Sequence, residues 1–184
     1  MISPMTALRL NSLGLLAICA VFGFAFADQL IFHDLPCPLC ILQRAGFFAA
    51  GFGIALNLTF GLKPGHYGLA ILGAILGGAI AVRQVLLHIV PGTGAYGDAF
   101  FGLHFYTWAF LVFLAMVVGS AVMLLFEEQF AGVKEHDPLT KNLAAFAVLA
   151  FGFFALANGV STVAECGAGL CPDSPTDYLL LQKP

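Results

Sequence analysis

Two cysteines three residues apart have the clearest chemical potential in this sequence. Cys37 and Cys40 lie in the stretch PCPLCILQR (residues 36–44), between two long apolar runs. Such a pair can close a disulfide, exchange it with other thiols or bind a metal ion. Because proline is tolerated in the first turn of a helix, we expect a helix that begins near Pro38, with Cys40 in its first turn. The helix N-terminus would favour the Cys40 thiolate, the nucleophile of thiol–disulfide exchange.

A second pair, Cys166 and Cys171, lies near the end of the chain, and its four-residue spacer contains two glycines. The flexible spacer predicts an exchangeable disulfide. The alternative is a passive structural disulfide, although so short a loop gains little stability from cross-linking. Zinc sites with four cysteines usually combine two short Cys-X-X-Cys knuckles, so this spacing disfavours zinc and we predict no metal ligand. The fifth cysteine, Cys19, lies inside an apolar run and is predicted to be a small buried residue.

Polar residues in apolar surroundings predict a ligand pocket near the first pair. Arg44 lies one helical turn after Cys40 on the same face, where it can stabilise a thiolate or donate to a carbonyl oxygen. The alternative is an arginine that extends to the membrane interface. Gln84 and His88 share a helix face at the end of another apolar run, with Arg83 beside them. These groups could bind the polar head of a redox ring such as a quinone. The alternative is that they form hydrogen bonds between helices.

The composition indicates that these residues are positioned by a membrane-embedded fold. Of the 184 residues 60% are hydrophobic and only 9% are charged, which excludes an ordinary soluble domain, and the absence of a basic patch argues against nucleic-acid binding. We therefore predict one all-α domain over residues 1–184, a polytopic bundle of about five membrane-spanning helices with a C-terminal tail at 161–184. The expected spans are 13–31, 41–60, 67–90, 105–126 and 143–160.

The distribution of cations predicts the orientation of the bundle. Lysine and arginine concentrate in cytoplasmic loops, and with five spans the following cations fall on the side of the N-terminus: Arg9, Lys63, Lys134 and Lys141. The other side holds mainly acidic residues: Asp34, Asp98, Glu165, Asp173 and Asp177, with Lys183 as its free cation. We predict an N-terminus inside and a C-terminus outside. Both cysteine pairs then face the outer compartment, where disulfides persist.

The first span has an alternative interpretation as a signal peptide. Residues 25–27 (AFA) resemble a signal-peptidase site after an apolar stretch, but the apolar run continues to Ile31 and is longer than a typical signal core. Cleavage would leave the predicted sidedness of the later segments unchanged.

The stretch around the first cysteine pair resembles a known family. A first span followed by Cys-X-Leu-Cys-Ile-X-X-Arg at residues 37–44, opening a second span, is similar to the DsbB family of bacterial disulfide-bond-formation membrane proteins. Residues 91–108, with their PG, YG, GLH and YTW segments, also resemble a branch of that family, so the resemblance extends over nearly the whole chain. It differs from the better-known four-span pattern, because the second cysteine pair follows an added fifth span.

This resemblance implies an activity, a cofactor and a partner. The implied protein is a quinone-dependent oxidoreductase of the bacterial inner membrane, with multiple spans and with both cysteine pairs in the periplasm. Cys166 and Cys171 would oxidise a periplasmic, DsbA-like thioredoxin-fold protein. Cys37 and Cys40 would then transfer the electrons to ubiquinone or menaquinone, with Cys40 and Arg44 beside the ring. Gln84 or His88 would complete the quinone site, in the region where the family often has a histidine.

Two other functions are compatible with the same residues. An enzyme related to vitamin K epoxide reductases, or a carrier of reducing equivalents in the reverse direction, also combines a Cys-X-X-Cys with a second pair. A non-enzymatic membrane assembly protein would use both disulfides for structure alone. Quinone reduction by a reduced dithiol partner would distinguish these classes.

Overall fold

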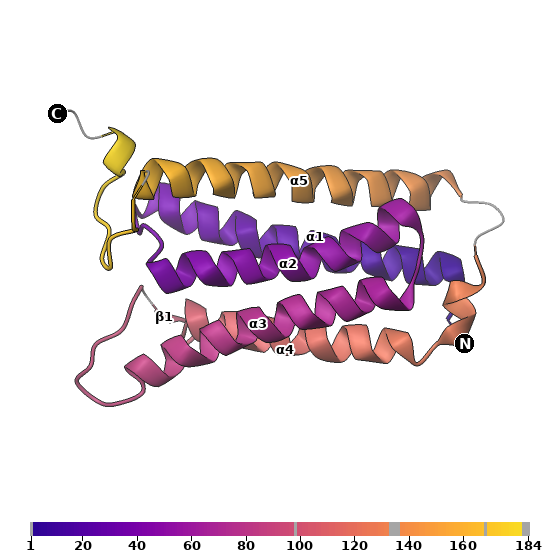
Figure 1. The fold of residues 1–184 in the computed structure, drawn as a ribbon, viewed down its shortest axis with the longest axis horizontal. Helices are drawn as coiled ribbons and strands as arrows, with labels where there is room; N and C mark the ends of the chain where they lie inside the picture. Colours follow the sequence, from indigo (N-terminus) through magenta and orange to yellow (C-terminus); the bar gives the residue numbers. More distant parts are fainter. Residues whose placement is uncertain (1, 98, 133–136, 168, 182–184) are drawn as a thin grey trace.

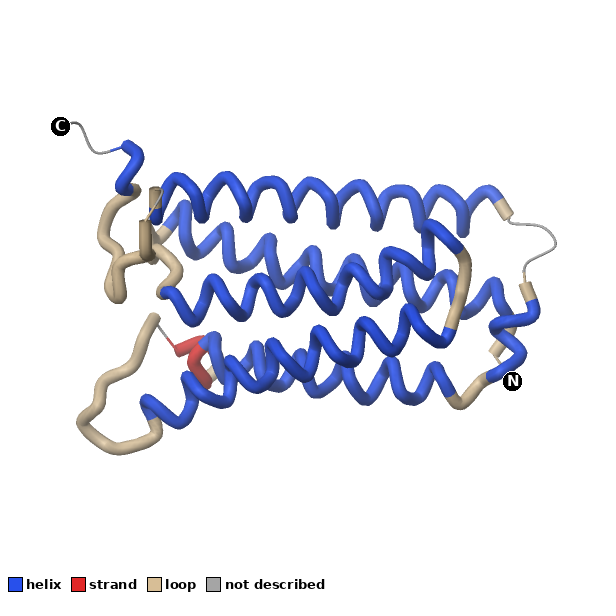
Figure 2. The backbone as a smooth tube through the Cα atoms, in the orientation of Figure 1, coloured by secondary structure: helices blue, strands red, loops and turns tan. Residues whose placement is uncertain are grey.

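The described part of the chain forms a bundle of five long helices (Figures 1 and 2). The computed structural model describes residues 2–97, 99–132, 137–167 and 169–181. The long helices are α1 (Pro4–Ile31), α2 (Pro38–Phe60), α3 (Pro64–His88), α4 (Phe105–Leu124) and α5 (Pro138–Cys166). The predicted all-α class with five spans is thereby confirmed. Short elements complete the described fold: a two-residue hairpin of β1 (Ala99–Phe100) and β2 (Leu103–His104), and the 3-10 helices η1 (Glu127–Ala131) and η2 (Leu179–Leu181).

Proline begins four of the five long helices, and polar caps set their exact starts. Ser3, Cys37 and Asp137 each precede a proline, and each side chain accepts a hydrogen bond from a backbone N–H in the first turn. These caps lie outside the apolar runs, so α1, α2 and α5 begin earlier than the hydropathy predicts. At its other end, α5 continues to Cys166, whereas the expected span ended at residue 160. Cys166 therefore belongs to the helix and not to the tail.

Glycines allow α2 and α3 to pack closely. The spacing of Gly73 and Gly77 on α3 predicts such a face. A Cβ atom at Gly73 would lie only 2.5 Å from the backbone nitrogen of Ala50, and one at Gly46 would lie 2.6 Å from the Cα atom of Gly77. Any side chain at these positions would push the two helices apart. The close approach fixes the position of the first cysteine pair, at the start of α2, relative to the end of α3.

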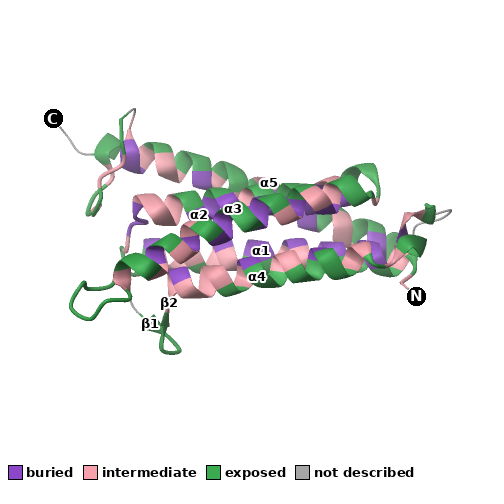
Figure 3. Cartoon of the chain, turned by 60° about the horizontal axis from the view of Figure 1, so that its bottom comes forward, coloured by how far each residue is buried: buried purple, intermediate pink, exposed green. Residues whose placement is uncertain are grey.

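The helices pack in a definite order. α3 packs against both α2 and α4, while α1 packs mainly against α5 and α2. Figure 1 shows α5 and α1 along one side of the bundle and α3 with α4 along the other, with α2 between them. The core between the helices is apolar and rich in phenylalanine, and includes the stacked rings of Phe47 and Phe113. Buried residues face inward and exposed residues face outward along each helix (Figure 3).

The outward faces of the bundle are also apolar. Large side chains such as Leu72, Leu149 and Phe153 are at least 66% exposed on α3 and α5. A continuous apolar exterior of this kind is stable in lipid and not in water. All five long helices have the length and hydropathy to cross a membrane. The protein is therefore a multi-pass membrane protein.

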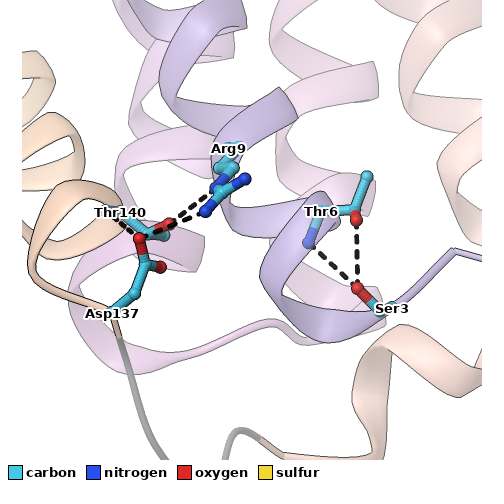
Figure 4. A network of polar contacts seen from close by, with 5 residues as sticks. All are labelled: Ser3, Thr6, Arg9, Asp137 and Thr140. Atoms are coloured by element: carbon cyan, nitrogen blue, oxygen red, sulfur yellow. Dashed lines mark hydrogen bonds and ion pairs between the residues drawn. The ribbon is translucent and has the colours of Figure 1, made fainter.

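One end of the bundle holds the described cations of the predicted inner side. Arg9 on α1 donates to the Thr140 hydroxyl (2.8 Å) and to Asp137 (3.1 Å) on α5, as Figure 4 shows. Hydrogen bonding to Thr140, together with the charge of Arg9, lowers the pKa of the Asp137 carboxyl. Lys63 follows α2 at the same end, where its backbone N–H donates to Asn57. The charges at Asp98, Lys134 and Lys183, which the predicted orientation also uses, lie outside the described residues.

The opposite end holds both cysteine pairs. The start of α2 and the end of α5 lie together there, and the two termini lie at opposite ends of the bundle (Figure 1). The predicted common location of the two pairs is confirmed by this arrangement. The orientation of the bundle relative to the cell stays a prediction.

The orientation can be tested with a membrane-impermeant maleimide. In a variant that retains only Cys166 and Cys171, we expect labelling in intact spheroplasts after reduction, because the cation distribution places this end outside. A cysteine-free variant with Leu62→Cys, at the opposite end, should be labelled only after permeabilisation. The reverse pattern would show that the C-terminus lies in the cytoplasm.

Candidate functional site

The Cys37–Cys40 disulfide lies at the N-terminus of α2. The two Cα atoms are 5.0 Å apart, within the usual range for a disulfide. Cys37 is the N-cap residue, and its sulfur accepts a hydrogen bond from the backbone N–H of Cys40 (3.2 Å). The helix N-terminus therefore favours negative charge on the Cys37 sulfur in this structure. The sequence predicted that it would favour the thiolate mainly at Cys40. Cys37 is buried and Cys40 is half-buried, so Cys40 is the more accessible of the two.

Gln84 contacts both sulfurs of this disulfide from α3. Its side-chain nitrogen is 3.4 Å from the Cys37 sulfur and 3.7 Å from the Cys40 sulfur. Gln43 on α2 donates to the Gln84 carbonyl oxygen (2.6 Å), which orients the Gln84 amide so that its N–H groups face the sulfurs. An N–H donor at this position stabilises a thiolate when the disulfide is reduced. Gln84, predicted as a cofactor contact, is thus placed at the disulfide itself.

Arg44 is buried between α2 and α1, with 9% of its surface exposed. Its guanidinium donates to the Gln29 side-chain oxygen (2.9 Å) and to the backbone carbonyl of Ala25 (3.3 Å). It also lies over the ring of Phe26, with Cζ 5.3 Å from the centroid, in a cation–π contact. These contacts hold the guanidinium inside the bundle and not at the lipid interface. Two of its three nitrogens make these bonds, so other N–H groups remain for a ligand.

An apolar cavity of about 510 Å³ opens beside Cys40 and Arg44. Its walls come from α1, α2, the loop after α3 and the start of α4, and are formed largely by aromatic and aliphatic side chains. Among the lining residues are Phe47 on α2, and Tyr106 and Trp108 on α4. A mostly apolar cavity of this size, with a few polar and charged groups among its lining residues, is typical of a site for a small molecule.

Tyr96 belongs to the loop that closes this cavity. Its hydroxyl donates to the backbone carbonyl of Leu35 (2.5 Å), which joins the loop after α3 to the segment before Cys37. Burial, together with the negative charges of Asp34 and Glu165, raises the pKa of Tyr96 to about 12. The hydroxyl therefore stays a hydrogen-bond donor at neutral pH and keeps the loop attached.

His88 and Arg83 do not line the cavity. The His88 ring stacks on Tyr106 with centroids 5.5 Å apart, and Tyr106 in turn lines the cavity, so His88 lies behind its wall. Arg83 is exposed on the outer surface of α3. The predicted cluster of Arg83, Gln84 and His88 is therefore wrong for Arg83, because a helix turns about 100° per residue and points this neighbour of Gln84 outward.

The Cys166–Cys171 disulfide joins the last residue of α5 to the tail. Cys166 is 5% exposed, whereas Cys171 is half-buried. The tail then returns to the bundle, where the Tyr178 hydroxyl accepts a hydrogen bond from the Gln29 side chain (2.8 Å). The predicted pairing of these two cysteines agrees with the structure. Among the described residues, no group of three or more histidine, cysteine or acidic side chains is arranged to hold a metal ion.

The sequence analysis did not identify two buried polar residues as candidates for a functional role. Gln29 is 2% exposed and connects Arg44 to Ser161 and Tyr178, so it joins the cavity to α5 and the tail. Glu165 was assigned to the acidic outer tail, but it lies in α5 and is completely buried. The sequence alone contained no signal for Glu165, because the expected span ended at residue 160 and only the extension of α5 to Cys166 places this ionisable residue in the bundle.

Comparison with known proteins places the first cysteine pair in a family context. The family model described as disulfide bond formation protein DsbB matches residues 8–96. Proteins called disulfide bond formation protein B are similar to the chain: 40% identical over 84 residues in Chromohalobacter salexigens (43% of this chain, 49% of the relative), and 33% identical over 97 residues in Nitrosospira multiformis (50% and 57%). The chain spans about half the length of the curated relatives it matches. No solved structure matches it.

The family match includes the first cysteine pair but not the second. The matched region contains Cys37, Cys40, Arg44, Gln84 and His88, but it ends before α4 and α5. The similarity is therefore narrower than the predicted resemblance over nearly the whole chain. The second cysteine pair and Glu165 belong to a part of the chain that the family match does not cover.

Proposed function

Because the chain belongs, through residues 8–96, to the DsbB family, we propose that it is a membrane thiol oxidoreductase for disulfide bond formation. It would reoxidise a periplasmic thioredoxin-fold dithiol protein, similar to DsbA, and pass the electrons to ubiquinone or menaquinone. The proposed location is the bacterial inner membrane, with both cysteine pairs on the periplasmic side. The observation that carries this proposal is the apolar cavity with Cys40 and Arg44 in its wall.

The residues of the cavity fit a quinone. Aromatic and aliphatic walls suit its ring and tail, and the buried Arg44 guanidinium supplies a charged donor for a ring carbonyl oxygen. A bound quinone would supply a two-electron acceptor beside the Cys40 sulfur. Cys40 is among the residues that line the cavity, whereas Cys37 and Gln84, which contact each other, are not.

The second disulfide would exchange with the soluble partner. A partner thiolate attacks one sulfur, the Cys166–Cys171 bond breaks, and a mixed disulfide forms. The second thiol of the partner then attacks the mixed disulfide. This step forms the disulfide of the partner and leaves Cys166 and Cys171 reduced. The reduced tail pair transfers its two electrons to Cys37–Cys40 by the same chemistry. We propose that Cys171 receives the first attack, because Cys166 is buried in the last turn of α5.

Trapping of the mixed disulfide tests this assignment. The oxidised wild-type protein is mixed with a reduced partner that lacks its own resolving cysteine, and the reaction is quenched with acid and alkylated. The partner thiolate bonds to one sulfur of Cys166–Cys171 and the other sulfur leaves as a thiol, so the mixed disulfide forms without a further oxidant. We expect mass spectrometry of the complex to find the partner on Cys171 and the alkyl group on Cys166. The opposite assignment would show that Cys166 receives the first attack.

The overall activity is tested with the purified protein. A reduced thioredoxin-fold dithiol protein and a short-chain ubiquinone or menaquinone are mixed with it, and loss of quinone and of thiols is followed together. We expect one quinone reduced for every two thiols oxidised. Thiol oxidation without quinone consumption, or no thiol oxidation, would contradict the proposed function.

A further inference from the structure

Gln29 on α1 connects the wall of the apolar cavity to the C-terminal tail. Its side-chain oxygen accepts a hydrogen bond from Arg44 (2.9 Å), and its side-chain nitrogen donates to the hydroxyls of Ser161 (2.7 Å) and Tyr178 (2.8 Å). Arg44 lines the cavity, whereas Gln29, which is 2% exposed, is not among the described residues of its lining. Gln29 can therefore act on a ligand in the cavity only through Arg44.

The three contacts fix the orientation of the Gln29 amide. A guanidinium has donors and no acceptor, so the amide oxygen must face Arg44, and the N–H groups of the amide then face the two hydroxyls. Ser161 belongs to α5 and Tyr178 belongs to the tail, so two separate segments hold the amide from the side away from Arg44. An amide held in this way presents its oxygen to Arg44 at a fixed position.

Gln29 in turn holds the Arg44 guanidinium, together with two other residues of α1. Arg44 also donates to the backbone carbonyl of Ala25 (3.3 Å) and lies over the ring of Phe26. An arginine side chain has many rotamers and tends to extend toward water, so a buried guanidinium needs acceptors that keep it inside the bundle. The Gln29 oxygen is the closer of the two acceptors, and its loss would free Arg44 to leave the cavity wall.

From these contacts we infer that Gln29 is the positioning residue that keeps Arg44 in the cavity wall for quinone, and that the tail supports this site through Tyr178. This role rests on the proposed function, because it requires that quinone binds in the cavity. A guanidinium that is already held in place loses less freedom when a ligand binds, so the affinity is higher. The tail then serves both sites: Cys171 exchanges with the soluble partner, and Tyr178 supports the quinone site.

The fluorescence of Trp108 measures quinone binding without turnover. Trp108 is the only tryptophan in the sequence and lines the cavity, so a quinone bound there should quench its emission. The oxidised full-length protein is titrated with a short-chain ubiquinone. We expect a dissociation constant about tenfold higher in Gln29→Met, which keeps the length of the side chain but removes the acceptor. In Tyr178→Phe the rise should be about threefold, because Ser161 still holds the amide.

Gln129 supplies the matched control. It is a second fully buried glutamine, at the opposite end of the bundle (Figure 1), where it donates to the backbone carbonyls of Met123 and Phe126 and accepts from the Tyr67 hydroxyl. Gln129→Met should lower the thermal stability about as much as Gln29→Met and leave the quinone dissociation constant unchanged. An equal rise of this constant in both variants would show a general loss of packing and overturn the inference.

A double-mutant cycle separates positioning from a structural role. If Gln29 and Tyr178 act through Arg44, neither substitution should weaken quinone binding further in an Arg44→Ala background, whereas independent structural effects would add. Additive effects would therefore overturn the inference. If Gln29→Met fails to fold, the cycle is measured with Tyr178→Phe, and an unchanged dissociation constant in that variant would have the same consequence.

The binding experiment also distinguishes this role of Gln29 from the proposed function. If quinone does not quench Trp108 saturably in the wild type, the cavity does not bind quinone and both proposals fail. Saturable quenching in the wild type, with the same affinity in a folded Gln29→Met, would refute the positioning role alone.

Discussion

Replacing Cys40 with alanine should reduce dithiol-dependent quinone reduction to the background level, and we expect the same effect from replacing Cys37. Either substitution leaves a single sulfur at the start of α2, which cannot close the disulfide that carries two electrons. Cys40 forms part of the cavity wall, so its loss also removes the sulfur nearest to the proposed acceptor. The measurement is quinone consumption with a reduced thioredoxin-fold partner.

Cys19 supplies the matched control for these substitutions. It is a free cysteine, 5% exposed, in the apolar core of the bundle and apart from both disulfides. Cys19→Ala should retain the wild-type rate, since it removes one sulfur atom from the core and no redox group. Full activity in Cys40→Ala would refute the relay, and loss of activity in a well-folded Cys19→Ala would show that the reactive cysteines have been assigned wrongly.

Replacing Arg44 with alanine should raise the apparent Michaelis constant for quinone by about one to two orders of magnitude. A charge-assisted hydrogen bond contributes about 1.5–3 kcal/mol, and each 1.4 kcal/mol corresponds to about tenfold in affinity. The estimate assumes that the Michaelis constant follows binding. Thiol exchange between the two cysteine pairs should persist, because it takes place between sulfurs. Arg44→Lys should restore binding only in part, since lysine lacks the planar guanidinium.

The control for Arg44 is the exposed arginine on α3. Arg83→Ala removes the same side chain from the outer surface and should leave the quinone dependence unchanged. Quinone reduction is measured against quinone concentration for the wild type and the three variants. An unchanged quinone dependence in Arg44→Ala would place the quinone elsewhere and leave Arg44 with the structural role of joining α1 to α2.

Some features of this protein are determined by the sequence alone. Long apolar runs separated by turns specify five spanning helices, because a backbone in lipid must satisfy its hydrogen bonds within the helix. An odd number of spans places Cys37–Cys40 and Cys166–Cys171 at the same end, and the short separation within each pair allows its disulfide. Pro38 predicts the start of the helix that carries Cys40 in its first turn. These predictions depend on local composition and chain order, which the sequence contains directly.

Other features were decided only by the tertiary structure. In a membrane helix both the lipid face and the core face are apolar, so hydropathy does not show which way a side chain points. The sequence could therefore not place Gln84 against the sulfurs, Arg83 outside, or His88 behind Tyr106. The ends of helices depend on caps and packing, which is why α5 reaches Cys166 and buries Glu165. The link from Arg44 through Gln29 to Ser161 exists only because α5, which follows far along the chain, packs beside α1 and α2.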